Sequence, residues 1–167
     1  ILRCLVGSEM CIRDRYMQGF GFLGTYDATI DDKGRIRLPA KFRALLGESF
    51  IIAQGAENCL SVYPAETWDK LTGQVAGLDS LDIEVMEFRR SLFSTANEGS
   101  FDAAGRVLIP QRQRNYADLK KELIVIGNFD CFEIWDKDNW EQKDYTSLEK
   151  RRSLQKGLKA QEDGRSN

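Results

Sequence analysis

The chain has 167 residues, of which 42% are hydrophobic and 30% charged, and its formal net charge is -2. This composition favours a folded protein over a disordered one, and no apolar run reaches the roughly 18 residues of a membrane span. The absence of histidine excludes Ser-His and Cys-His nucleophile pairs and histidine-based metal sites. The four cysteines form no CxxC pair, so a reducing cytoplasm fits best. We therefore expect no catalytic residues, no metal, no cofactor and no membrane.

The first sixteen residues differ in character from the rest of the chain. Arg3 and Glu9 interrupt their apolar stretch, which makes it a poor signal peptide. The segment resembles translated sequencing-adapter read-through. We therefore expect a non-native extension at 1–16 and a natural start at Met17, with a genuine short extension as the alternative.

An internal repeat organises the remaining sequence. The segment 30–39, IDDKGRIRLP, matches 101–110, FDAAGRVLIP, with Asp, Gly, Arg and Pro in register 71 positions apart. Trp68 and Trp140 match at 72 positions, so one inserted residue separates the two registers. Because the matches span a turn, a strand, a helix start and an aromatic anchor, they predict two copies of one small unit.

The first copy begins with an alternating pattern at 25–30, which predicts a strand. The residues Asp31–Gly34 favour a turn, because Asp bonds nearby backbone N–H groups and Gly takes positive φ. Pro39 suits the first turn of a helix, and Gly47 suits its end. The predicted elements are strands at 25–30, 35–38, 50–53 and 60–63, and helices at 40–46 and from Pro64 through Leu71.

Between the copies, residues 80–96 carry apolar side chains near helical spacing, which predicts an amphipathic linker helix. After about Lys150 the chain turns polar, so we expect a frayed end. The second copy repeats the plan of the first. Its predicted elements are strands at 100–101, 106–109, 123–126 and 131–135, a turn at Gly127–Asn128 and a helix at 139–144.

These elements predict an α+β fold that is mainly β. Two tandem, pseudo-symmetric ββαβ-type repeats each have an exposed strand edge, and pairing their strands would close a small barrel of swapped hairpins with peripheral helices. The predicted divisions are an extension at 1–16, a first repeat at 17–79, the linker helix at 80–96, a second repeat at 97–145 and a polar tail at 146–167.

The doubled pattern D-x-x-G-R-hydrophobic-x-hydrophobic-P-x-x-x-R resembles the MraZ family, over about residues 20–140. The resemblance implies an AbrB-like swapped-hairpin barrel. It also implies a regulator of the division and cell-wall gene cluster, including its own promoter, that forms ring-shaped oligomers. One departure is Leu23, which stands where the family often has a basic residue before the first glycine.

The resemblance places the DNA-contacting basic residues at Lys33, Arg35 and Arg106. Arg37 shares a strand face with Arg35, so the exposed side of the first hairpin should be basic. Ala104 replaces Lys33 in the second motif, so the two copies should contribute unequally.

Each motif arginine also has a structural interpretation, in which it pairs with an aspartate and braces the turn. We expect mainly structural roles for Asp31, Gly34, Asp102 and Gly105, and DNA contact for Arg35 and Arg106. Weaker candidates are open between supporting DNA binding, pairing with acids and lying at subunit contacts; these are Lys41, Arg43, Arg112 and Arg114. Buried packing is expected for Cys59 and Cys131, and core positions for Trp68 and Trp140.

Three functions remain open at this point. The first is sequence-specific binding of double-stranded DNA at promoter direct repeats, with repression by a cytoplasmic, nucleoid-associated homo-oligomeric ring, because repeated weak contacts add avidity. The second is an oligomeric scaffold or antitoxin-like binding module of the same fold. The third, an enzyme, is the least favoured, since no nucleophile-base pair or small-molecule site is visible.

Overall fold

The computed structural model describes residues 21–78, 81–143, 145 and 147–165, with side chains through Leu158. The extension expected at 1–16 lies outside these residues. The chain divides into two compact units, one ending at Asp136 and the other beginning at Lys137.

The first repeat contains the elements that its sequence predicts. Pro39 and Pro64, with φ near the helical value, each precede a helix, and Gly47 ends the first of these with φ +78°. The elements are β1 (Thr25–Thr29), β2 (Arg35–Arg37), α2 (Ala40–Leu46), β3 (Phe50–Gln54), β4 (Leu60–Pro64) and α3 (Ala65–Ala76).

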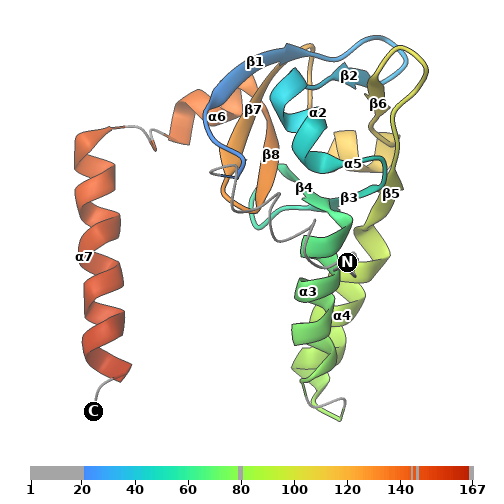
Figure 1. The fold of residues 1–167 in the computed structure, drawn as a ribbon. Helices are drawn as coiled ribbons and strands as arrows, with labels where there is room; N and C mark the ends of the chain where they lie inside the picture. Colours follow the sequence, from blue (N-terminus) through green and yellow to red (C-terminus); the bar gives the residue numbers. More distant parts are fainter. Residues whose placement is uncertain (1–20, 79–80, 144, 146, 166–167) are drawn as a thin grey trace, which may run out of the picture. The chain divides into compact units, whose positions relative to one another are not determined.

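The linker helix is also confirmed, as α4 (Ile83–Thr95), where the carboxylate of Asp82 accepts a hydrogen bond from the N–H of Glu84 at 2.8 Å. It packs beside α3. The rings of Trp68 and Phe93 lie edge to face with centroids 6.1 Å apart, and the Arg89 guanidinium donates a hydrogen bond to the carbonyl of Val75 at 2.9 Å. Figure 1 shows these helices extending together from the sheet.

The second repeat has the same order of elements. They are β5 (Asn97–Gly99), β6 (Arg106–Leu108), α5 (Gln111–Tyr116), β7 (Glu122–Asn128) and β8 (Cys131–Asp136). The strand expected at 100–101 lies instead at β5, and Phe101 forms an isolated bridge with Val107.

The turn expected at Gly127–Asn128 is wrong, because β7 continues through both residues and pairs them with Phe132 and Cys131. The N–H of Gly127 donates to the carbonyl of Gly24 at 2.8 Å, and a Cβ at Gly127 would collide with the backbone of Phe22. Residue 127 is therefore a glycine because the backbone of Phe22 passes close to it, and not because the chain turns there.

The strands of the two repeats interlock. The larger sheet has six antiparallel strands in the order β1-β7-β8-β4-β3-β5, and the smaller sheet pairs β2 with β6. The first strand of each repeat thus joins the hairpin of the other, while β4 and β8 meet at the centre. This arrangement, visible in Figure 1, gives the unit an approximate twofold symmetry.

The closed barrel expected from the sequence is not found among the described residues. β1 and β5 form the two ends of the six-stranded sheet, and β2 and β6 lie in a separate sheet reached through isolated bridges. β2 and β6 have three residues each, because Pro39 and Pro110 follow closely, lack an N–H and direct the chain into helices.

The core lies between the sheets and α2. Phe42 of α2 contacts Phe22, Tyr26 and Phe132 with ring centroids 5.1–5.2 Å apart. Cys59 and Cys131 are buried, as the sequence predicts, and burial raises the pKa of the Cys131 thiol to about 12. The Cys131 thiol is therefore protonated at neutral pH.

The second unit contains α6 (Lys137–Lys143) and α7 (Leu148–Arg165). The frayed end expected after Lys150 is wrong, because α7 continues through this region. The hydroxyl of Ser147 accepts a hydrogen bond from the N–H of Lys150 at 3.1 Å. This N-cap satisfies a backbone donor of the first turn and stabilises the start of the helix. Trp140 packs against Tyr145 with centroids 5.5 Å apart.

Candidate nucleic-acid interface

The turn between β1 and β2 is held by one carboxylate. The Oδ1 atom of Asp31 accepts from the backbone N–H of Lys33 at 3.0 Å and of Arg35 at 2.9 Å. Its Oδ2 atom accepts from Arg35 Nε at 2.8 Å, and Arg35 Nη2 lies 2.7 Å away. Gly34 completes the turn at φ +80°, a conformation that few L residues adopt.

The turn between β5 and β6 repeats this geometry. Asp102 Oδ1 accepts from the N–H groups of Ala104 and Arg106, both at 2.9 Å, and Oδ2 pairs with the Arg106 guanidinium at 2.9 Å. Gly105 has φ +71°. The brace between aspartate and arginine is therefore present at both turns.

The hydrogen bonds affect the acidity of both carboxyls. The Arg35 side chain lowers the pKa of Asp31 from 3.8 to about 2, and the Arg106 backbone N–H is the leading cause of the lowered pKa of Asp102. Both braces are therefore ionised at neutral pH.

The pairing of β2 with β6 sets which side chains share a face. Arg35 is opposite Leu108, and Arg37 is opposite Arg106, while the intervening pair Ile36 and Val107 is buried. Side chains alternate along a strand, so the remaining four form the outer face of this two-stranded ribbon. We call this set the ribbon face: Arg35, Arg37, Arg106 and Leu108.

The structure therefore gathers three of the four predicted DNA-binding residues on the ribbon face, and Lys33 lies at the adjoining turn. The side chains of Arg35 and Arg106 are 27% and 31% exposed, so the aspartates orient them without sealing them from solvent. Arg37 and Lys33 are exposed. A cross-repeat contact of 3.9 Å between Arg106 Nη1 and Asp31 Oδ2 links the two turns.

Two further arginines cross between the repeats. An added Cβ at Gly34 would lie 2.7 Å from Arg114 Cζ, and one at Gly105 would lie 2.6 Å from Arg43 Nη1. Each guanidinium thus rests against the turn glycine of the other repeat. The sequence marked these arginines only by their shared offset from the motif prolines, and it left three roles open.

Positive charge is concentrated in these segments. Residues 31–43 contain five basic and two acidic residues, and residues 102–114 contain three basic and one acidic residue. Their net charges of +3 and +2 contrast with -2 for the whole chain. The acidic remainder of the molecule therefore leaves a local basic surface suited to an anionic partner.

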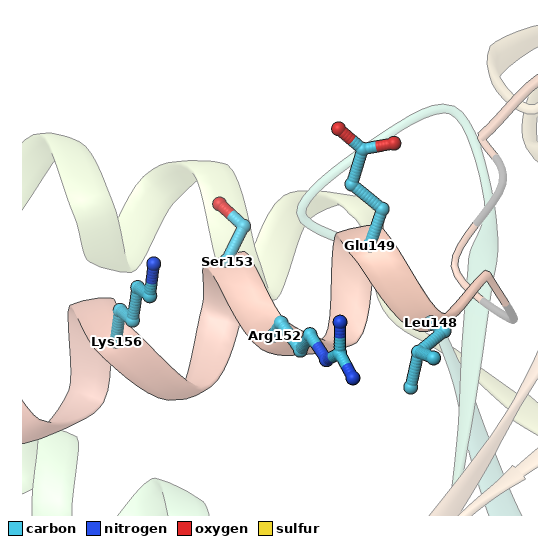
Figure 2. A pocket seen from close by; sticks show the side chains of 5 residues that line it. All are labelled: Leu148, Glu149, Arg152, Ser153 and Lys156. Carbon is cyan, nitrogen blue, oxygen red and sulfur yellow. The ribbon is translucent and has the colours of Figure 1, made fainter.

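Other kinds of site find little support in the described part of the chain. It holds no group of three or more His, Cys, Asp or Glu side chains placed to bind a metal ion. None of its helices is long and apolar enough to cross a membrane. A pocket on α7 is lined by Leu148, Glu149, Arg152, Ser153 and Lys156, all from one helix, which does not enclose a ligand by itself (Figure 2).

Comparison with known proteins agrees with the doubled motif. The family described as "MraZ protein, putative antitoxin-like" matches residues 22–90 and again residues 92–160. The transcriptional regulator MraZ of Acetivibrio thermocellus is 43% identical over 120 residues, covering 72% of this chain and 84% of that protein.

Two further relatives carry the same name. The transcriptional regulator MraZ of Clostridium tetani is 43% identical over 121 residues, covering 72% of this chain and 85% of the relative. That of Lactiplantibacillus plantarum is 41% identical over 121 residues, covering 72% and 86%. These are transcriptional regulators and not enzymes. Two successive family matches and relatives of this identity show that the chain belongs to the MraZ family.

Proposed function

We propose that this protein regulates transcription by binding double-stranded DNA through the ribbon face and the adjoining turns. The observation that carries the proposal is the antiparallel pairing of β2 with β6, which places Arg35, Arg37 and Arg106 on one outer face. The major groove of DNA is wide enough to admit a two-stranded ribbon of this kind. The family match supports the regulatory role.

The braces favour this function because they fix the arginines before DNA arrives. Nε and Nη2 of Arg35 face Asp31, which leaves Nη1 for a ligand. A guanidinium that is already oriented loses less conformational entropy on binding, and its free Nη1 can donate to a base edge or to a phosphate oxygen. The aspartates thus act as positioning residues for the DNA contacts.

We further propose that the protein acts as a ring-shaped homo-oligomer on promoter direct repeats. A single ribbon offers few contacts, whereas linked copies raise avidity by roughly 10² to 10⁴. Exposed apolar side chains near the free end of the α3 and α4 pair supply surface for self-association: Leu78, Leu81, Ile83 and Phe88. The family resemblance points to repression of the division and cell-wall genes, including the protein's own promoter, and hence to the nucleoid.

The test is a titration of the purified protein against its own upstream DNA at several salt concentrations. Specific binding should survive competitor DNA and weaken steeply with salt. The variant Lys33→Ala/Arg37→Ala spares both braces and should weaken binding while light scattering shows the oligomer unchanged. Arg90→Ala, which removes an exposed arginine of α4, is the matched control.

Equal affinity for the wild type and the double alanine variant would show that the ribbon face is not the interface. An intact oligomer that binds no DNA at any salt concentration would instead support a scaffold or antitoxin-like binding module, the second function that the family description favours.

A further inference from the structure

Arg43 and Arg114 differ from the braced arginines in their surroundings. Both are half-buried, and the Nε atom of each is buried with no hydrogen-bond partner among the described residues. The ion pairs found there for Arg35 and Arg106 involve Asp31 and Asp102, whereas no such pair is found for Arg43 or Arg114. Among the half-buried arginines of the two described motif segments, these two are therefore the ones without an ion pair.

An unpaired, half-buried charge opposes folding, because it loses hydration without gaining a counter-ion. Here the arrangement occurs twice, at equivalent positions, with each guanidinium against a turn glycine whose missing Cβ makes the space for it. Pairing with acids, one of the roles left open by the sequence, is therefore not what the structure shows for these residues. An anion from outside the protein would supply the missing counter-charge.

We propose that Arg43 and Arg114 form two phosphate-binding positions for the DNA backbone, one beside each turn. Arg114 serves the turn of the first repeat, and Arg43 serves the turn of the second. This inference rests on the proposed function and deepens it by assigning different contacts to different residues. The ribbon face contacts base edges in the major groove, and Arg43 and Arg114 bind the phosphates on either side. Phosphate contacts fix the register of a protein on DNA without reading sequence.

Each of the two positions joins both repeats. Each arginine belongs to the helix of one repeat and lies at the turn of the other, so the two cations lie on either side of the paired turns. Two phosphate contacts on either side of the ribbon would hold it at a set depth in the groove. A lone surface lysine would give attraction without this alignment.

The experiment compares Arg43→Gln/Arg114→Gln with the wild type and with the control Arg90→Gln, on specific and non-specific duplexes across a range of KCl concentrations. Glutamine keeps much of the side-chain length and removes the charge. The slope of log affinity against log salt should become shallower by about 0.9 for each phosphate that the variant no longer neutralises. Affinity should fall by a similar factor on both duplexes, and Arg43→Lys/Arg114→Lys should recover much of the slope.

A parallel thermal unfolding measurement keeps a structural role distinguishable. If the arginines serve binding, the glutamine variant unfolds at or above the wild-type temperature in low salt, and inorganic phosphate stabilises the wild type more than this variant at equal ionic strength. A lower unfolding temperature with an unchanged salt slope would overturn the inference. If the double variant does not fold, Arg43→Gln and Arg114→Gln are measured singly, each with half of the expected change in slope.

The two proposals fail in different ways. Wild-type protein that binds no DNA overturns the proposed function. Wild-type protein that binds with the expected salt dependence, beside a glutamine variant of equal slope and affinity, overturns only the phosphate positions.

Discussion

The turns of the two repeats have the same internal structure and different outer surfaces. Each has an aspartate brace and a glycine at positive φ, but Lys33 of the first corresponds to Ala104 of the second, and Arg37 corresponds to Leu108. Leu108 is 58% exposed on the ribbon face. The ribbon is therefore symmetric in its backbone and asymmetric in its charge, so the proposed complex with DNA would have a direction.

The helices that follow the motifs, α2 and α5, differ in a buried residue and not in an exposed one. Phe42 of α2 packs among three aromatic rings, whereas the equivalent residue of α5 is Gln113, which is 1% exposed. Its amide nitrogen donates to the carbonyls of Ile52 at 2.7 Å and Thr95 at 3.0 Å. One helix is thus anchored by apolar packing and the other by hydrogen bonds.

The largest expected effect comes from removing the apolar anchor. Phe42→Ala should lower the free energy of unfolding by about 3–5 kcal/mol, because it leaves a cavity among packed rings. Urea denaturation measures the change, and Phe129→Ala, which removes a side chain that is 70% exposed, is the control. A decrease below about 1 kcal/mol would mean that the ring cluster does not hold α2.

Removing the polar anchor should cost less. Gln113→Ala leaves two buried carbonyls without their donor, which is expected to cost about 1–3 kcal/mol, while one unpaired Gln113 oxygen is also removed. The neighbouring Gln111→Ala, on the exposed side of α5, should stay within about 0.5 kcal/mol of the wild type in the same urea experiment. If both variants are destabilised equally, the two amide bonds are not what anchors α5.

Exchanging the outward residues tests the asymmetry of the ribbon face. Arg37→Leu should weaken DNA binding by roughly 1–3 kcal/mol if the guanidinium contacts a base edge, and Leu108→Arg should increase the salt slope by about 1 through an added phosphate contact. Fluorescence anisotropy with labelled duplex measures both. If both variants bind with the affinity and the salt slope of the wild type, the charge difference between the repeats has no role in binding.

The smallest effect concerns acid. Because the folded pKa of Asp31 is lowered to about 2 from 3.8, the stability that its ionised brace contributes is complete above about pH 4 and is lost as the pH falls toward 2. The urea midpoint of the wild type should therefore exceed that of Asp31→Asn at pH 6, and the gap should close on acidification. Asp32→Asn, at the exposed neighbour, is the control, and a gap that persists at pH 2 would contradict the brace.

Local chemistry made much of the fold predictable. Pro39 and Pro64 located α2 and α3 because proline favours a first helical turn, and Asp31–Gly34 located the first hairpin because those residues favour a tight turn. The repeat then carried the same plan into the second half. The predicted turn at Gly127–Asn128 was wrong because a tertiary contact determines the structure there. Gly127 lies in a strand, where the backbone of Phe22 passes close to it.

The site was predictable only where it is local. The pairing of Asp31 with Arg35 follows from their spacing across one turn, and it was foreseen as one of two interpretations. The approach of Arg114 to Gly34 joins residues 80 positions apart, which periodicity and turn chemistry do not report. The opposition of Arg37 and Arg106 likewise depends on the register between repeats.

The interchange of first strands has a consequence for how the molecule is assembled from its halves. A polypeptide ending after α4 would keep the β3–β4 hairpin but lack β5, and β1 would have no β7 to pair with. Such a half-length product could complete the ladder only by associating with a second molecule, at a rate and extent set by concentration. Covalent linkage makes that association intramolecular, so β1 and β5 find their partners β7 and β3 within one newly made chain.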